Sequence, residues 1–236
     1  MNVRVKFRKY GNLKFIGHLD VMRYFQKAMR RAEIPVCYSE GFSPHMIMSF
    51  ASPLGVGLTS NGEYMDVRVE ESPSSAEAVS RLNAVMVEGI EVLSWRALPD
   101  KAGNAMASVA AADYDVRFRE GYAPEDGWQD RFRIFMGRSS VTVIKEGKKG
   151  SRELDIRPLI YDWNICGDVI FLQVSAGSAS NLKPELLMKA FAESEGMELS
   201  PFSLMIHRRE LYADQGTEEK RRLIPLEMLG EEIGRA

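Results

Sequence analysis

The chain has 236 residues, of which 45% are hydrophobic and 27% are charged, a composition that supports a packed core in one large or two small domains. No segment approaches the roughly 18 consecutive apolar residues of a membrane-spanning helix, and we expect no signal-peptide hydrophobic region at the N-terminus. Cys37 and Cys166 are the only cysteines. Because they lie far apart, they fit a reducing cytosol better than a disulfide framework, so we expect a cytoplasmic protein.

Positive charge is concentrated at the N-terminal end. The first 36 residues contain nine Lys or Arg and two acidic residues, a formal charge of +7. Because the net charge of the whole chain is −2, the other 200 residues carry a charge of about −9. This separation favours a polyanion as the partner of the N-terminal segment.

The first part of the chain predicts the order β-α-β-β-α-β. In chain order we expect a strand at residues 3–7, a helix at 18–32, strands at 46–51 and 64–69, a helix that follows Ser74, and a strand at 90–95. The helix at 18–32 is predicted because Val21, Phe25 and Met29 share one side of a 3.6-residue period. Ser74 and Glu77 have the spacing of a capping box.

A second round of the same plan follows. The expected elements are a strand at 114–118, a helix that begins at Pro124, a strand through Val141 and Val143, a hairpin that returns through Leu154 and Ile156, a strand at 169–174, a helix at 184–195 and a strand at 202–211. The predicted fold is therefore α+β, with two tandem ferredoxin-like (βαββαβ) units, the second with an extra hairpin strand. We expect unit boundaries at 1–98 and 113–212, a linker at 99–112 and a charged tail at 213–236, loosely attached as a helix or partly disordered.

Several strings occur together in this sequence. They are Phe15-Ile16-Gly17-His18-Leu19-Asp20, Arg30-Arg31-Ala32, Tyr38-Ser39-Glu40-Gly41-Phe42-Ser43-Pro44-His45, Ser49-Phe50-Ala51, Pro53-Leu54, Glu63-Tyr64 and Asp155-Ile156-Arg157-Pro158. As a set they resemble the radical-SAM-linked bacterial domain of unknown function, over most of residues 2–212. The family residues that the resemblance identifies here are His18, Leu19, Asp20, Ser39, Gly41, Phe42, Pro44, His45, Asp155 and Arg157. Gly17 replaces a serine that is usual in the family.

The resemblance implies a radical SAM protein as partner, but no established reaction. This chain cannot itself hold the iron–sulfur cluster, which needs three closely spaced cysteines. The tandem layout is also similar to that of CRISPR repeat-processing endoribonucleases, a likeness at the level of fold.

The best candidate binding surface is the basic side of the helix at 18–32. Arg23, Lys27, Arg30 and Arg31 lie within about 100° of arc, with Lys9 and Lys14 in adjoining segments, and such spaced cations can contact phosphates. The alternative is a solvated helix face that only balances acidic neighbours.

Two loops are further candidates for nucleic-acid binding. In the loop 38–45, Phe42 can stack on a base, while Gly41 and Pro44 shape a tight turn; the alternative is a connector that covers the sheet edge. In the second unit, Lys148, Lys149 and Arg152 on a glycine-flanked hairpin can hold phosphate, or can be an ordinary exposed tip. Asp155 and Arg157 then share a strand face and can pair. His207-Arg208-Arg209 near the last strand carries the same two alternatives.

Catalysis is the alternative to binding. His18, His45 and Tyr38 could serve a metal-independent endoribonuclease, since such an enzyme needs a base and an acid. However, His18 falls on the apolar side of its helix, where a buried structural histidine is the simpler interpretation. We expect no metal, because His18, His45 and His207 have no ligand spacing, and no cofactor.

The sequence therefore predicts a noncatalytic RNA-binding or substrate-presenting accessory protein of a radical SAM enzyme, acting on structured RNA in tRNA or rRNA maturation or modification. The alternatives are the endoribonuclease and a protein-interaction platform that docks a radical SAM enzyme through the basic helix.

Overall fold

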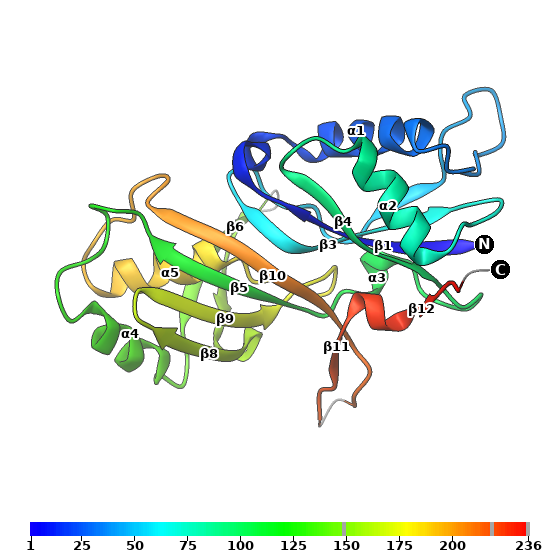
Figure 1. Cartoon of the computed structure of the whole chain (residues 1–236). Coiled ribbons are helices and arrows are strands. Elements are labelled where there is room, and N and C mark those ends of the chain that lie inside the picture. Colours follow the sequence, from blue (N-terminus) through cyan, green and yellow to red (C-terminus); the bar gives the residue numbers. More distant parts are fainter. Residues whose placement is uncertain (148–149, 218–219, 235–236) are drawn as a thin grey trace. The chain divides into compact units, whose positions relative to one another are not determined.

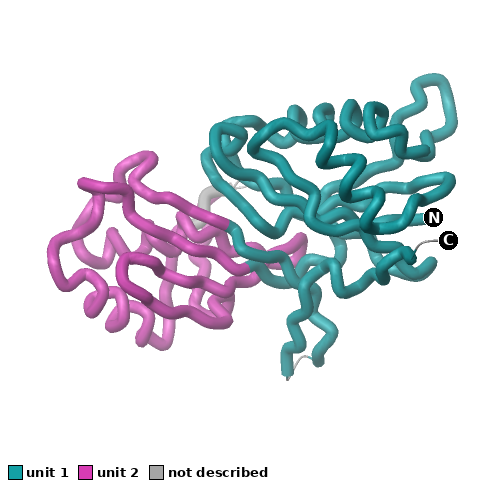
Figure 2. The backbone as a smooth tube through the Cα atoms, in the orientation of Figure 1, with its two compact units in different colours: residues 1–112, 208–236 teal, residues 113–207 magenta. Residues whose placement is uncertain are grey.

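The computed structural model describes residues 1–147, 150–217 and 220–234 (Figure 1). The fold is mixed α+β, with strands that pair mostly antiparallel and few helices. The chain forms two compact units, residues 1–112 with 208–236 (unit 1) and residues 113–207 (unit 2), coloured separately in Figure 2. In the described ranges, no helix is long and apolar enough to cross a membrane.

Unit 1 begins with alternating strands and helices. Its elements up to residue 97 are β1 (Asn2–Lys9), the 3₁₀ helix η1 (Gly11–Phe15), α1 (His18–Arg31), β2 (Met48–Phe50), β3 (Thr59–Arg68), α2 (Ser75–Val85) and β4 (Ile90–Ala97). The strands follow the order β4-β1-β3, with β2 on the other side of β3. Both helices lie over one face of this sheet, as Figure 1 shows.

The core of unit 1 lies between the sheet and the two helices. Alternation in β1 directs Val3, Val5 and Phe7 to the helix side, where all three are buried. The ring of Phe7 lies 4.7 Å from that of Phe25 in α1. Ser74 accepts the backbone N–H of Glu77 at 3.3 Å, which begins α2 at the predicted place.

Gly62 lies inside β3, although the composition of Ser60-Asn61-Gly62 is typical of a turn. A Cβ at this position would lie 2.5 Å from the Cα of Glu210, in the neighbouring strand β10 (Leu204–Asp214). The glycine therefore permits a close approach of two strands. Glycine is expected both in turns and where two strands approach closely, so the sequence alone does not distinguish the two cases. The pairing of β3 with β10 does.

The segment 99–112 is more ordered than a linker. It contains α3 (Ala105–Ser108), whose first residue, Ala105, is buried. The backbone N–H of Ala105 donates to Asp66 Oδ2 at 2.6 Å, and Asn104 caps the helix through the N–H of Ala107 at 2.8 Å. These bonds attach the segment to unit 1.

The described part of the segment 213–236 is also folded onto unit 1, contrary to the expected loose tail. It forms β11 (Leu223–Pro225), the 3₁₀ helix η3 (Leu226–Leu229) and β12 (Glu231–Glu232). Strand β11 pairs with β10, and β12 pairs with β4. Leu226 is fully buried, and this apolar anchor explains why the charged segment stays attached.

Unit 2 has two strands that form a separate hairpin. Its elements are β5 (Ala111–Phe118, which begins in unit 1), α4 (Trp128–Met136), β6 (Thr142–Gly147), β7 (Gly150–Asp155), the 3₁₀ helix η2 (Arg157–Leu159), β8 (Ile160–Cys166), β9 (Val169–Ser175), α5 (Pro184–Ser194) and residues 204–207 of β10. The order in its main sheet is β10-β5-β9-β8, and β6 and β7 pair only with each other.

The unexpected element of unit 2 is β8. We predicted one extra hairpin strand, but two strands stand outside the sheet, and residues 160–166 supply the missing sheet strand. Strand β8 alternates Tyr161, Trp163 and Ile165 with the polar Asp162 and Asn164, so the period-2 signal is present in the sequence and we missed it. Its Trp163 ring packs 5.9 Å from Phe132, a contact that local periodicity does not encode.

Candidate nucleic-acid interface

The fold separates the N-terminal cations into two groups. The first group lies on β1 and comprises Arg4, Lys6 and Arg8, whose charges are neutralised by acidic residues of the same chain. Arg4 binds Asp66 with two hydrogen bonds of 2.8 and 2.9 Å. Lys6 Nζ lies 2.6 Å from Glu210 Oε2 and 2.7 Å from Glu227 Oε1, and Arg8 pairs with Glu91.

The contacts among Lys6, Tyr64, Glu210 and Glu227 shift the pKa of both Lys6 and Tyr64. Burial alone would lower the pKa of Lys6, but the hydrogen bonds with Glu210 and Glu227 outweigh it and raise the pKa. Tyr64 donates its hydroxyl to Glu210 Oε1 at 2.6 Å. Burial, and then the Glu210 charge, raise the pKa of Tyr64 far above its usual range, so the phenol stays protonated. These groups form a structural network rather than a surface for phosphate.

Lys9 does not lie on the predicted phosphate-binding surface. Only 2% of the residue is exposed, and its Nζ donates to the carbonyl of Ile16 at 3.3 Å. Burial lowers the pKa of Lys9, as expected for a desolvated ammonium group. The alternation of β1 contains the signal that we missed, because Lys9 follows Phe7 by two residues and therefore shares the core face.

The second group of cations lies on α1 and faces solvent. Arg23, Lys27, Arg30 and Arg31, here called the α1 cationic face, are all exposed. Arg23 Nη1 lies 3.8 Å from Asp20 Oδ1, and 69% of its side chain is exposed. The other three have no ion-pair partner among the residues that the structure describes. Lys14 is half-buried, with Nζ 5.1 Å from the ring centre of the exposed Phe15.

The α1 cationic face retains unfavourable charge repulsion. Arg23 and Lys27, and Lys27 and Arg31, are four residues apart, and each such like-charge pair costs about 0.2–0.5 kcal/mol. Arg30 and Arg31 are in the last turn, where the helix dipole offsets part of this cost. A bound polyanion would relieve the repulsion along the whole face.

The loop 38–45 projects beyond the end of α1 (Figure 1). Ser39 donates its backbone N–H to the His45 carbonyl at 2.9 Å, and its Oγ lies 2.9 Å from His45 Nδ1. Gly41 has a φ of 104°, which only glycine adopts without strain. Phe42 at the tip is fully exposed, and Tyr38 in the stem is 46% exposed. The closed stem therefore presents an aromatic ring to solvent.

The three candidate catalytic residues do not form one site in the described structure. His18 is half-buried, and its ring lies 5.0 Å from that of Phe50 at 86°, an edge-to-face contact. His45 is bound to Ser39, and Tyr38 pairs with Met46 in the loop stem. Within the described ranges, no hydrogen bond or ring contact joins His18 to His45 or Tyr38.

The candidate residues of unit 2 have separate positions. Lys148 and Lys149 lie outside the described residues. Arg152 is exposed on β7. Asp155 does not pair with the Arg157 guanidinium; its Oδ1 accepts the backbone N–H groups of Arg157 at 3.0 Å and Val141 at 2.9 Å. These bonds lower the pKa of Asp155 and close the base of the β6–β7 hairpin.

Arg208, in the string His207-Arg208-Arg209, is buried rather than available for phosphate. Its Nε lies 2.9 Å from Glu63 Oε1 and its Nη2 lies 2.6 Å from Glu63 Oε2. The Ser52 carbonyl accepts a further bond from Nη2 at 2.6 Å. The two charged residues are 145 positions apart, so no local pattern indicated the pair.

Residues 2–184 match the family described as an uncharacterized protein conserved in bacteria, DUF2344. The chain belongs to this family. The match includes the α1 cationic face and the loop 38–45 of this DUF2344 protein, and it ends before Arg208 and the C-terminal segment. No curated protein gives a significant match.

Two solved structures are similar to this DUF2344 chain at low identity. A crystal structure of a Cbf5-Nop10-Gar1 complex is 12% identical, with a TM-score of 0.47, over 89% of this chain and 48% of that one. The first two RRM domains of yeast poly(U) binding protein (Pub1) are 13% identical, with a TM-score of 0.20, over 88% and 98%. The chain spans about half the length of the first of these. Both TM-scores are too low to define the fold.

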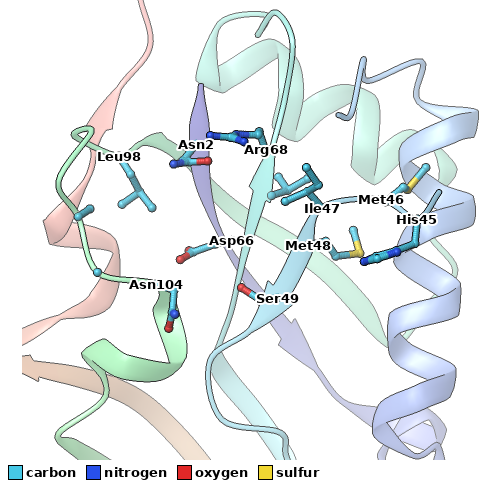
Figure 3. Close-up of a pocket in the computed structure, with 13 residues that line it drawn as sticks. Asn2, His45, Met46, Ile47, Met48, Ser49, Asp66, Arg68, Leu98 and Asn104 are labelled. Carbon is cyan, nitrogen blue, oxygen red and sulfur yellow. The ribbon is translucent and has the colours of Figure 1, made fainter. Parts of the chain in front are cut away.

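The DUF2344 chain also has a pocket that the sequence did not indicate. It lies within unit 1, has a volume of about 300 Å³, and is shown in Figure 3. Its walls come from the start of β1, residues 45–49, β3 and residues 98–104. His45 is the one candidate catalytic residue that lines it. Neither in the pocket nor elsewhere among the described residues is a group of three or more His, Cys, Asp or Glu placed to hold a metal ion.

Proposed function

We propose that this DUF2344 protein is a noncatalytic RNA-binding module that acts as an accessory of a radical SAM protein in the maturation or modification of tRNA or rRNA. One observation carries the RNA proposal: four exposed cations on one face of α1, three of them without an ion-pair partner in the described part of the chain. Phosphates bind cations spaced along a surface in this way. The radical SAM partner is supported by the family strings, such as His18-Leu19-Asp20.

We also infer that both units are ferredoxin-like. The order β-α-β-β-α-β and the strand order β4-β1-β3-β2 support this for unit 1. The order β10-β5-β9-β8, with the β6–β7 hairpin as an insertion, supports it for unit 2.

The helix side of unit 1 is the better RNA surface in this proposal. On the opposite face of the sheet, Arg4 donates to the carbonyls of Leu226 at 3.3 Å and Gly103 at 3.2 Å. Segments from η3 and residues 98–104 therefore cover β1 there. The charges of Arg4 and Lys6 are also neutralised on that face, whereas α1 remains open to solvent.

The loop 38–45 favours RNA with unpaired bases. An exposed aromatic ring such as Phe42 can stack on a base only when that base has left its duplex. Because only six residues separate the end of α1 at Arg31 from the start of the loop at Tyr38, one RNA strand could contact both. We therefore expect single-stranded RNA to bind more tightly than a duplex of the same sequence.

The test is the binding of a fluorescent RNA across a salt series. The variant changes Arg23, Lys27, Arg30 and Arg31 to Ala, and each lost phosphate contact should reduce the slope of log affinity against log salt by about 0.7. A matched control changes the exposed Arg117, Arg133, Arg138 and Lys183 of unit 2 to Ala, with the same loss of charge. Equal slopes in the two variants, or no binding by the unmodified protein at low salt, would refute the proposal.

A further inference from the structure

The pocket in unit 1 lies on the sheet face opposite α1 and α2. In β3, Met65 and Val67 point into the core, so Asp66 and Arg68 point to the other face. Cross-strand pairing places Asn2 beside Arg68, and Ser49 beside Asp66. Figure 3 shows these side chains around one hollow, with Asn104 across from β3.

The charges around this pocket favour an anion. Both oxygens of Asp66 bind Arg4, and Oδ2 also accepts the N–H of Ala105 at 2.6 Å, so this carboxylate is compensated within the protein. Arg68 is exposed, and among the described residues its guanidinium has no ion-pair or hydrogen-bond partner. The remaining charge at the pocket is therefore positive. A free guanidinium binds phosphate with two parallel hydrogen bonds.

The other polar groups are mainly donors. Asn104 uses its Oδ1 to cap α3, which leaves its amide nitrogen available. Asn2 and His45 add an amide and a second ring nitrogen, because His45 uses only Nδ1 for Ser39. Ser49 supplies a hydroxyl that can donate or accept. A ligand here must present several acceptors.

Apolar side chains also line the pocket. In Figure 3, Ile47 and Met48 lie on one side and Leu98 lies across from them. The volume of about 300 Å³ is at the lower end of the range for small-molecule sites. A ligand of this size with an anionic group, further acceptors and a flat apolar surface matches the lining.

We propose that this pocket binds one nucleoside monophosphate unit, with its phosphate at Arg68 and its base against Ile47, Met48 and Leu98. This unit is either a free mononucleotide or the terminal nucleotide of an RNA. If the ligand is a free mononucleotide, the inference is independent of the proposed function. If the ligand is the end of an RNA, the inference rests on it. The α1 cationic face is not part of the pocket, so the two can fail separately.

The test is isothermal titration of the full chain with adenosine and uridine monophosphates. Removal of a charge-assisted contact should weaken binding by Arg68→Ala about tenfold or more. The Arg68 side chain is exposed and has no ion-pair or hydrogen-bond partner among the described residues, so the substitution should not affect folding. Arg117→Ala in unit 2 is the matched control and should bind as tightly as the unmodified protein. Absence of binding by both mononucleotides, or equal affinity of Arg68→Ala, would overturn the proposal.

Three further arms define the ligand. The unphosphorylated nucleosides and inorganic phosphate should each bind more weakly than the mononucleotides, and phosphate that binds as tightly would overturn the role of the base. An oligonucleotide with a terminal phosphate should displace the mononucleotide if the pocket takes an RNA end, and should fail to do so if it takes free nucleotides. The variant that lacks the α1 cationic face should still bind mononucleotides, even if it no longer binds RNA.

Discussion

The pair Glu63–Arg208 shows that burial decides how much an ion pair matters for the stability of the fold. Both side chains are at most 7% exposed, and the two are joined by hydrogen bonds at Nε and Nη2. Arg8 and Glu91 also pair, but their side chains are 40% and 37% exposed. Water screens the second pair, whereas the first has no water to replace a lost partner.

We therefore predict that Glu63→Ala lowers the free energy of unfolding by about 3–5 kcal/mol, because Arg208 would be left charged and buried. Glu91→Ala should cost about 0–1 kcal/mol. Urea denaturation followed by circular dichroism measures both. Similar losses for the two variants would contradict the difference in burial on which the prediction depends.

At the scale of elements, η3 is attached to β1 by an ion pair as well as by Leu226. Burial alone would raise the pKa of Glu227, but the hydrogen bond and charge of Lys6 outweigh it and lower the pKa. A lowered carboxyl pKa means that the contact stabilises the folded segment above the ordinary value of 4.5, and that this stabilisation disappears as pH falls through the lower folded-state pKa. The raised pKa of Lys6 has the opposite consequence at alkaline pH: its contribution is present below 10.5 and disappears as pH rises above that value.

The segment 223–234 should thus loosen in acid before the core of unit 1 does. We expect its amide signals to shift and broaden in an NMR titration from about pH 6 to about pH 3. In Glu227→Gln this change should be much smaller, because the residue no longer titrates. Glu231→Gln, at an exposed residue of β12, is the control and should behave like the unmodified protein. An identical titration of Glu227→Gln would show that other groups hold the segment.

At the scale of the whole molecule, unit 1 is built from two distant parts of the chain. Residues 208–236 supply Arg208 for Glu63, Glu210 for Lys6 and Tyr64, and Leu226 for the core. The strand β10 also pairs with β3. The N-terminal part alone would leave these buried charges without partners.

We predict that a fragment of residues 1–112 does not fold into a stable unit. A chain in which a short flexible linker joins residue 112 to residue 208 should fold, because it restores every one of these partners. The dispersion of amide signals in NMR spectra distinguishes the two outcomes. A well-dispersed spectrum from residues 1–112 alone would show that the C-terminal part is dispensable.

The local features of this protein were predictable from its sequence. The alternation of Val3, Val5 and Phe7, the two-sided pattern of α1 and the cap at Ser74 each depend on residues within one or two turns or strands. The exposure of the α1 cationic face follows from the same period, since a buried stripe leaves the opposite side to solvent.

Only the tertiary structure decided which charges are available. Arg4, Lys6 and Arg208 are basic in the sequence just as Arg23 and Lys27 are, yet their acidic partners lie 62 to 221 residues away. The attachment of the C-terminal segment and the pocket beside Arg68 depend on the same long-range pairing. The physical reason is that periodicity reports which side of an element is apolar, whereas the partner of a buried charge is set by which strands the completed fold brings together.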